Sequence, residues 1–376
     1  PGNNYVFGSG ALGTETIING VKTTVTPNEL LEWERSNQTD FGLDFGFFGN
    51  SLQFTADYFF KRTDGMLIEM PVPTYLGESK PWGNVGSMSN TGVELDLSYR
   101  YSIGDFNFSV GANATYIKTL LINAGNESGI LDRGSVHQMG TIIRGENGQP
   151  FPYFFGYKTD GVFQNWGEVY AYTNAEGRLV QPDAQPGDFR YQDINGDGSI
   201  TAEGDRTNLG KCVPSWTYGF NAGFDWKGID FSMLLQGQLG AQAYNVSRRI
   251  DLGAVNLPKY MLNRWTGEGT SNKYPKFEVG DATNYVVSDV WVEDASFLRA
   301  RNVQFGYTLP QKITRKFFVQ RLRVYAQAEN LFTLTKYQGC DPELTGGNSS
   351  YGTEVGIDRG VYPQSRTFSV GVNLTF

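Results

Sequence analysis

The stretch GVELDLSYRY, residues 92–101, decides the fold because its apolar and polar side chains alternate from one position to the next. The apolar set is Val93, Leu95, Leu97, Tyr99 and Tyr101, and the polar set is Glu94, Asp96, Ser98 and Arg100. A period of two is typical of a β-strand, whose successive side chains point to opposite faces. The stretch therefore predicts a strand with one apolar and one polar face.

Eight further segments repeat this pattern along the chain. They occupy residues 38–48, 52–62, 106–118, 215–226, 229–239, 297–307, 322–332 and 368–376. Aromatic residues make up 14% of the chain and there are 47 glycines. Charged residues make up 19%, against roughly 25% in soluble domains. This composition suits strands with many turns and predicts an all-β fold.

The connections between these segments alternate between short and long. Short connections fill residues 49–51, 102–105 and 227–228, with a moderate one at 308–321, and long connections fill 63–91, 119–214, 240–296 and 333–367. Bacterial outer-membrane barrels have short periplasmic turns and long extracellular loops. We therefore predict a transmembrane antiparallel β-barrel whose polar face lines the lumen and whose apolar face contacts lipid. The alternative is a large soluble β-protein that packs its apolar face against a second sheet.

Aromatic residues near the ends of the predicted strands match the girdles that such barrels carry at both membrane interfaces. They are Tyr58, Tyr99, Tyr101, Tyr116, Trp216, Tyr218 and Trp226. The nine strands are an odd number, whereas single-chain bacterial barrels have an even number. We therefore expect residues 38–376 to be the C-terminal portion of a larger barrel that an N-terminal part of the same barrel completes. Residues 1–37 are expected to be an extracellular loop region leading into it.

The sequence also excludes several classes of function. The formal net charge of −8 argues against a nucleic-acid-binding protein, which needs a basic surface. No triad of nucleophile, base and orienting acid can be assembled around His137, the only histidine, so we predict that the chain is not an enzyme. The acid pair Asp40 and Asp44 shares one face of a strand and needs no catalytic explanation. Whether Cys212 and Cys340 form a disulfide stays open.

Several motifs resemble those of a known transporter family. They are NELLEWERSNQTDFGLDFGFFGNSLQFTADYFFKRTDGML (28–67), NVGSMSNTGVELDLSY (84–99), GYKTDGVFQN (156–165), PGDFRYQDINGDGSITAEGDR (186–206), SDVWVEDASFLRARNVQFGYTLP (288–310) and AENLFTLTKYQGCDPE (328–343). Their order and content resemble the C-terminal barrel half of SusC/RagA-type TonB-dependent outer-membrane transporters. The resemblance covers residues 28–376 and implies part of a barrel of about 22 strands, a size that holds a plugged lumen.

This resemblance implies active, TonB-dependent import of a nutrient, either an oligosaccharide or a peptide, across the bacterial outer membrane. It also implies a SusD-like surface lipoprotein as partner on the extracellular loops and contact with TonB through a region N-terminal to this chain. The alternative is a passive outer-membrane porin or an adhesin built on the same barrel. A plug domain and a TonB box upstream would distinguish the importer from these alternatives.

The motif DINGDGSITAEGD, residues 193–205, reads like the first half of a calcium-binding loop. An EF-hand needs oxygen ligands at alternating positions, glycine at the sixth position and a bidentate glutamate at the twelfth. The early positions match, but Gly204 holds the twelfth. Either Asp205 or Glu203 closes a structural Ca²⁺ site in this predicted extracellular loop, or the motif forms metal-free Asn-Gly and Asp-Gly turns. The candidate ligands are Asp193, Asn195, Asp197, Ser199 and Asp205.

Aromatic residues in the predicted loops suggest stacking against sugar rings. Packing within the loops or against a partner protein is the simpler interpretation, because aromatic side chains commonly anchor interfaces. The residues are Trp82, Phe151, Tyr153, Phe154, Phe155, Trp166, Tyr170, Tyr172 and Tyr260. The sequence therefore assigns no residue to substrate binding.

Overall fold

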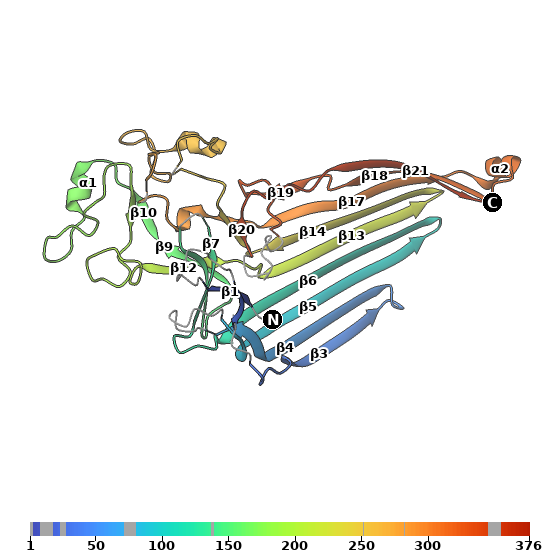
Figure 1. The fold of residues 1–376 in the computed structure, drawn as a ribbon. Helices are drawn as coiled ribbons and strands as arrows, with labels where there is room; N and C mark the ends of the chain where they lie inside the picture. Colours follow the sequence, from blue (N-terminus) through green and yellow to red (C-terminus); the bar gives the residue numbers. More distant parts are fainter. Residues whose placement is uncertain are drawn as a thin grey trace.

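Nine long strands form one antiparallel sheet in the computed structural model, which describes residues 3–7, 18–22, 28–70, 80–136, 139–250, 252–281, 283–344 and 355–376. They are β3 (Arg35–Phe47), β4 (Leu52–Glu69), β5 (Trp82–Ile103), β6 (Phe106–Asn123), β13 (Trp216–Trp226), β14 (Ile229–Leu239), β17 (Phe297–Thr308), β18 (Arg321–Glu329) and β21 (Thr367–Thr375). Their order across the sheet is β21-β18-β17-β14-β13-β6-β5-β4-β3, and the short β19 (Thr333–Thr335) also pairs with β17 (Figure 1). Each overlaps one predicted strand, so the prediction of nine strands is confirmed. We call this sheet the wall.

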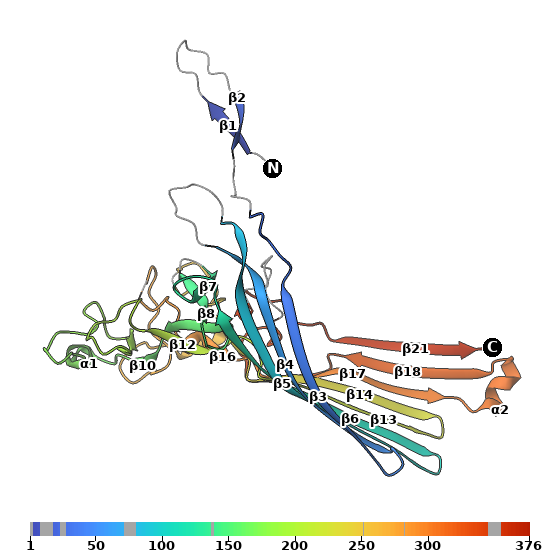
Figure 2. The ribbon, with the colours of Figure 1, turned by 90° about the horizontal axis from the view of Figure 1, so that it is seen from below.

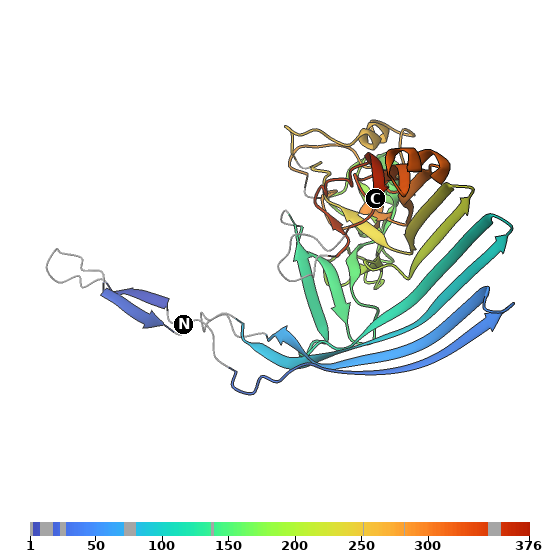
Figure 3. The ribbon, with the colours of Figure 1, turned by 90° about the vertical axis from the view of Figure 1, so that its right-hand side faces the viewer.

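The register of the wall places apolar side chains opposite one another on one face. Across five neighbouring strands, Phe54 lies opposite Leu97, Leu97 opposite Ala112, Ala112 opposite Phe220, and Phe220 opposite Leu235. Polar residues alternate with them along each strand. The sheet curves as the wall of a barrel does (Figure 3), and inward and outward side chains alternate along every strand of a barrel. The wall therefore has one lipid-facing and one lumen-facing surface.

Aromatic residues mark both margins of the lipid-facing surface. At one margin Tyr116 packs against Trp216, with ring centroids 5.1 Å apart. At the other margin Phe106 packs against Phe224, with centroids 5.7 Å apart, and Trp226 lies directly opposite Phe106. β13 covers the distance between the margins with 11 residues, about the 9–11 residues that a tilted strand needs to cross a membrane.

Tight turns close the wall at one end. Lys227 and Gly228 connect β13 to β14 with φ angles of 48° and 89°, and a two-residue hairpin turn with positive φ at both positions matches the twist of the strands. The longest connection at this end contains α2 (Gln311–Thr314) and η4 (Arg315–Phe317). We call this side of the wall, at the right of Figure 1, the short-turn end.

Strands β4 and β5 are longer than predicted, and the connection between them is shorter than the predicted span 63–91. β4 continues to Glu69 and β5 begins at Trp82. The register shifts around Gly65, whose φ is +69°, and such a bulge changes the alternation from which strand ends are predicted. β6 likewise continues to Asn123, and β3 begins at Arg35 rather than at 38.

The opposite end carries the long connections, which contain folded elements of their own. These are β7 (Ile130–Ser135), β8 (Thr141–Glu146), β9 (Tyr153–Tyr157), β10 (Thr159–Val162), α1 (Trp166–Ala171), β11 (Phe189–Tyr191), β12 (Arg206–Lys211), β15 (Gln242–Asn245), η2 (Lys259–Asn263), η3 (Asp289–Trp291), β16 (Val292–Asp294) and β20 (Ile357–Asp358). They form a four-stranded sheet β12-β9-β8-β7, a pair β10-β11 and a sheet β16-β15-β20. We call the described residues within 124–214, 240–296 and 336–366 the loop body.

The largest hydrophobic core of the described chain lies in the loop body. Phe154, Phe189, Tyr244 and Trp291 are among its members, and none is more than 1% exposed. The loop body extends beyond the wall, on the side opposite α2 (Figure 1). Its connections are therefore packed domains rather than open loops.

The N-terminal hairpin of β1 (Asn3–Phe7) and β2 (Ile18–Lys22) forms a two-stranded sheet of its own that stands apart from the wall (Figure 2). Within the predicted leading region, residues 1–37, the structure describes 3–7, 18–22 and 28–37. Among the residues that the structure describes, every helix is too short or too polar to cross a membrane.

Candidate functional site: the lumen wall and the loop body

The lumen-facing surface of the wall carries hydrogen-bonded polar side chains that link neighbouring strands. The guanidinium of Arg323 on β18 donates through Nε to Asp230 on β14 at 2.9 Å and through Nη2 to Gln304 on β17 at 3.0 Å. At a neighbouring position, Asn107 donates to Asp225 at 2.8 Å. These contacts hold side chains across the wall, and they leave a hydrophilic surface along which water and polar solutes can lie.

Acidic groups outnumber basic groups on this lumen-facing surface. The acidic residues are Asp40, Asp44, Asp57, Glu94, Asp96, Asp225, Asp230 and Glu329, and the basic residues are Lys61, Arg100, Arg321 and Arg323, together with Arg299 and Arg301, which pair with acids of the loop body. A surface lined by one sign of charge concentrates ions of the opposite sign and repels ions of its own. The described wall therefore favours neutral or cationic solutes over anionic ones.

A buried ionic network attaches the loop body to the wall. Arg299 on β17 is 2% exposed and binds Asp341 at 2.6 Å and Glu343 at 2.8 Å, and Asp341 is 3% exposed. Arg301 on the same strand also pairs with Glu343. Burial alone would raise the pKa of Asp341, but hydrogen bonds from the backbone N–H groups of Gln364 and Glu343 and from Arg299 bring it below its ordinary value.

A second attachment joins residue 337 to β20. The hydroxyl of Tyr337 donates to the carboxylate of Asp358 at 2.6 Å, and both side chains are buried. Burial and this bond to a carboxylate raise the pKa of Tyr337. The Arg299 network thus attaches the last long connection to the wall, and the Tyr337–Asp358 bond joins the two described parts of that connection.

The hydrophobic core of the loop body encloses a cation. Arg248 is fully buried, its Cζ lies 3.6 Å from the ring centroid of Trp291, and its Nη2 donates to the Tyr244 hydroxyl at 2.6 Å. Its Nε and Nη1 have no hydrogen-bond partner among the described residues. Burial lowers the pKa of Arg248. Cation–π contacts and one hydrogen bond therefore compensate the loss of water around this group.

A buried acid and amide pair joins two of the long connections. Asn284 donates to Asp188 at 2.8 Å and accepts from the backbone N–H of Phe189 at 2.9 Å. Lys276 lies 3.3 Å from Asp188. Burial raises the pKa of Asp188, and the neighbouring lysine and hydrogen bonds offset only part of this effect.

The five predicted calcium ligands lie in one described loop, where they bond mainly to its backbone. Asp193 accepts the N–H groups of Gly196 and Gly198 at 2.7 and 2.8 Å. The fully buried Asp205 accepts those of Ile194 and Thr201 at 2.8 and 2.6 Å.

The exposed members of the set bond to one another. Asp197 accepts from Asn195 at 2.8 Å and from the Ser199 hydroxyl at 2.9 Å, and the bond from Asn195 is the main cause of the lowered pKa of Asp197. Within the part of the chain that the structure describes, no three His, Cys, Asp or Glu side chains come close enough together to hold a metal ion. The arrangement explains each residue without a metal, and the Ca²⁺ site stays a prediction.

Most of the loop aromatics belong to the packed interior. Tyr153, Phe154 and Phe155 are buried in β9. Trp82, Trp166 and Tyr170 are the exceptions. Trp82 is 39% exposed, and Trp166 and Tyr170 stack on α1 with centroids 5.6 Å apart while 50% and 63% exposed. They are available for contact with a partner or a solute.

The remaining predicted features have simple outcomes. Cys212 is buried, Cys340 is exposed and both are free thiols, so the disulfide left open by the sequence does not form. His137 lies outside the described residues. No pattern in the sequence predicts Arg248 or the pair of Arg299 with Asp341, because their importance depends on burial that only the tertiary structure creates.

Comparison with known proteins identifies the family. The family model described as the β-barrel of TonB-dependent receptor-like proteins matches residues 1–331. TonB-dependent receptor P3 of Formosa agariphila is 32% identical over 96% of this chain and 36% of its own length. TonB-dependent receptor SusC of Bacteroides thetaiotaomicron is 27% identical over 93% of this chain and 32% of its own length.

The solved structure of the RagAB peptide importer in its closed-closed state superposes with a TM-score of 0.75 and 27% identity, covering 100% of this chain and 39% of that one. The chain thus spans 32% to 39% of the length of these relatives. The family match, the nine-strand wall and the structural likeness agree. The chain belongs to the β-barrel family of TonB-dependent receptors and forms part of a barrel in the bacterial outer membrane.

Proposed function

We propose that the protein to which this chain belongs imports a nutrient across the outer membrane with energy delivered through TonB. The observation that carries this proposal is the likeness of the whole chain to the RagAB peptide importer, at 27% identity and a TM-score of 0.75. Family membership also favours TonB-dependent uptake over a passive porin or an adhesin. In this proposal the chain supplies barrel wall and external loops and carries out no catalysis.

The proposed partners are TonB and a SusD-like surface lipoprotein. TonB would act from the periplasm, on the short-turn side, and the lipoprotein would sit on the loop body. The loop body suits such contact because it is a packed domain with exposed aromatic residues, among them Trp166 and Tyr170 at 50% and 63% exposure. Aromatic side chains of this kind contribute much of the binding energy at protein interfaces.

The proposed cargo is a peptide or an oligosaccharide. RagAB is a peptide importer by its description, which favours peptides. The acidic lumen-facing surface supports neutral or cationic cargo of either class, because a row of carboxylates repels anions. Strongly anionic glycans are the least compatible with it.

Uptake in cells tests this function. A strain lacking the full gene would be supplied with a peptide mixture or with neutral oligosaccharides as the limiting nutrient, with and without a protonophore. We expect one class to support growth only when the gene is present, and we expect short-term uptake of that class, measured with a labelled compound, to stop when the protonophore is added. Uptake that persists without the proton gradient would favour the porin. The partner is tested separately: purification of the full-length protein from outer membranes without an accompanying lipoprotein would contradict the proposed SusD-like partner.

A further inference from the structure

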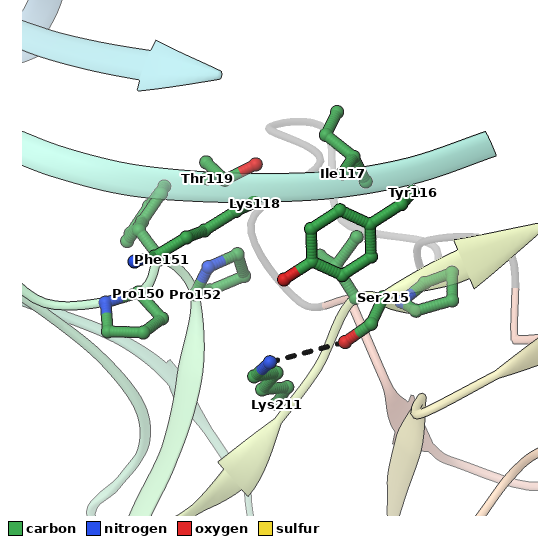
Figure 4. A pocket seen from close by; sticks show the side chains of 11 residues that line it. Tyr116, Ile117, Lys118, Thr119, Pro150, Phe151, Pro152, Lys211 and Ser215 are labelled. Atoms are coloured by element: carbon green, nitrogen blue, oxygen red, sulfur yellow. Dashed lines mark hydrogen bonds between the residues drawn. The ribbon is translucent and has the colours of Figure 1, made fainter. Parts of the chain in front are cut away.

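A small pocket opens at the point where β6 loses β13 as its neighbour. Its volume is about 140 Å³. The N–H of Ile117 donates to the carbonyl of Ser215 at 3.0 Å, and two residues later the carbonyl of Thr119 accepts from Phe151 at 3.3 Å. A different segment thus replaces β13 alongside β6, and the pocket occupies the junction between the two segments (Figure 4).

The pocket lies on the lipid-facing side of the wall. Tyr116 lies opposite Val93 and Trp216 in the apolar register, and Lys118 follows Tyr116 by two residues and shares its face. Figure 4 shows Tyr116 on the same side of β6 as Lys211, with Ile117 and Thr119 on the other side. The pocket is therefore built on the outer surface of the barrel rather than on the lumen.

Two lysines give this pocket a positive charge. Lys118 and Lys211 are exposed, and Lys211 donates to the Ser215 hydroxyl at 3.2 Å. Neither forms an ion pair with a carboxylate of the described residues, whereas the chain as a whole has a net charge of −8. The pocket lining contains hydroxyl and aromatic residues and no acid. It therefore presents cations and hydroxyl donors without a counter-charge.

The pocket lies at the level of the lipid headgroups along the membrane normal. The apolar belt ends at the aromatic row of Tyr116 and Trp216, and aromatic rows of this kind lie at the headgroup level of a membrane. Lys118 is one step further out along β6. The strands β6 and β13 lie in the middle of the wall, with β3 and β21 at its edges. Strands that join the wall at those edges leave this surface in contact with lipid.

We propose that this pocket binds the phosphate of an anionic lipid headgroup at the loop-body side of the membrane. The ammonium groups of Lys118 and Lys211 would neutralise the phosphate, and the hydroxyls of Ser215 and Tyr116 would donate hydrogen bonds to its oxygens. The acyl chains would lie along the apolar surface below the aromatic row. Inorganic phosphate shares the headgroup chemistry but lacks this apolar contact. The site is independent of cargo and of TonB.

The test uses the full-length protein purified in nanodiscs of phosphatidylglycerol and transferred to a mild detergent. Native mass spectrometry then measures how much phosphatidylglycerol remains bound as free lipid is diluted. Each lysine near an anionic headgroup contributes enough for about a fivefold change in affinity, so we expect Lys118→Gln with Lys211→Gln to weaken retention roughly 30-fold. The matched control is Lys61→Gln, because Lys61 lies opposite Asn90 on the lumen-facing surface of the same wall.

Three outcomes would overturn the proposal. Retention by the double variant equal to that of the unmodified protein would show that the lysines bind no headgroup. An equal loss in Lys61→Gln would show a general charge effect. Displacement of the lipid by inorganic phosphate at similar concentration would assign the site to free phosphate. Lys118→Arg, which keeps the charge, separates lost binding from lost folding, because it should retain the lipid.

Discussion

The wall and the loop body place their apolar side chains in opposite ways. In the wall, Phe41 and Val370 are 68% and 80% exposed and belong to a surface that faces lipid. In the loop body, Phe154 and Trp291 are 0% and 1% exposed. The wall is held by backbone hydrogen bonds between strands, and the loop body by a hydrophobic core like that of a water-soluble domain.

Because of this difference, substitutions destabilise the two regions for different reasons. A protein core loses stability when a cavity forms inside it. Truncating a side chain on a lipid-facing surface opens no internal cavity. The stability of such a surface is lowered instead by a charged substitution.

The largest effect is expected from Phe154→Ala in the core of the loop body. Phe154 packs against Tyr244 with ring centroids 6.1 Å apart, and truncating a buried phenylalanine costs about 3–5 kcal/mol. Hydrogen exchange should show faster opening of β9 while the wall keeps its protection. Val370→Ala is the control, and equal destabilisation by both variants would contradict the comparison.

A charge in the wall should have the next largest effect. Ala222→Lys places an ammonium on the lipid-facing surface near the middle of β13, where a lysine costs about 2–4 kcal/mol. Urea titration of the full-length protein folded into lipid vesicles measures this loss. Asn221→Lys faces the lumen on the same strand and should cost far less. A similar cost for the two variants would refute the assigned faces of the wall.

The Asp341 attachment should depend on acid. The folded pKa of Asp341 lies below its ordinary value, so its stabilising contribution is complete above the unfolded pKa near 3.8 and is lost as the pH falls through the lower folded value. Hydrogen exchange of residues 341–344 should accelerate in that window. Asp341→Asn should weaken the attachment at neutral pH, by about 2–3 kcal/mol, and remove the acid dependence.

Calcium should stabilise the loop at 193–205 if the predicted site exists. Millimolar Ca²⁺ acting on a site of extracellular strength would contribute about 1 kcal/mol. The measurement is the protection of residues 193–205 from proteolysis, with and without a chelator. Asp193→Asn combined with Asp197→Asn should abolish any calcium effect. Protection that is identical in chelator and in calcium would decide for metal-free turns.

The smallest effect is expected from Arg248→Met. The substitution removes the contacts of the guanidinium, but it also removes the free-energy cost of burying its charge. Replacing a buried ionic group by a packed apolar side chain is often close to neutral. We expect the unfolding temperature to stay within a few degrees of the original, and Arg248→Ala to lower it through a cavity. A large loss in Arg248→Met would mean that a bound anion or water depends on the guanidinium.

The wall could be predicted from the sequence because each of its strands shows both of its environments. Leu95 and Asp96 alternate between lipid and lumen, so the period of two survives in the amino-acid order. The structure differs from the prediction at strand ends, and in the β4–β5 pair the bulge at Gly65 interrupts that period. The short connections can also be predicted from the sequence. One example is the Lys227–Gly228 turn, whose glycine adopts a positive φ.

The interior of the loop body could not be predicted in the same way. Its short strands, such as β9 with Tyr153–Tyr157, are buried on both faces, so no alternation reveals them. The contact between Arg299 and Asp341 joins residues 42 positions apart, and no local pattern connects them. The pocket lined by Lys118 and Lys211 likewise exists only because the fold brings these two distant residues to the same place.

The two edge strands of the wall determine how the isolated chain should behave in solution. Among the described strands, β3 and β21 each pair on one side only, and β3 is exposed along its whole length. Unpaired N–H and C=O groups on a long edge act as a template for further strands. A preparation of this segment alone should therefore associate edge to edge as its concentration rises, whereas the same edges in the intact barrel are sealed and inert.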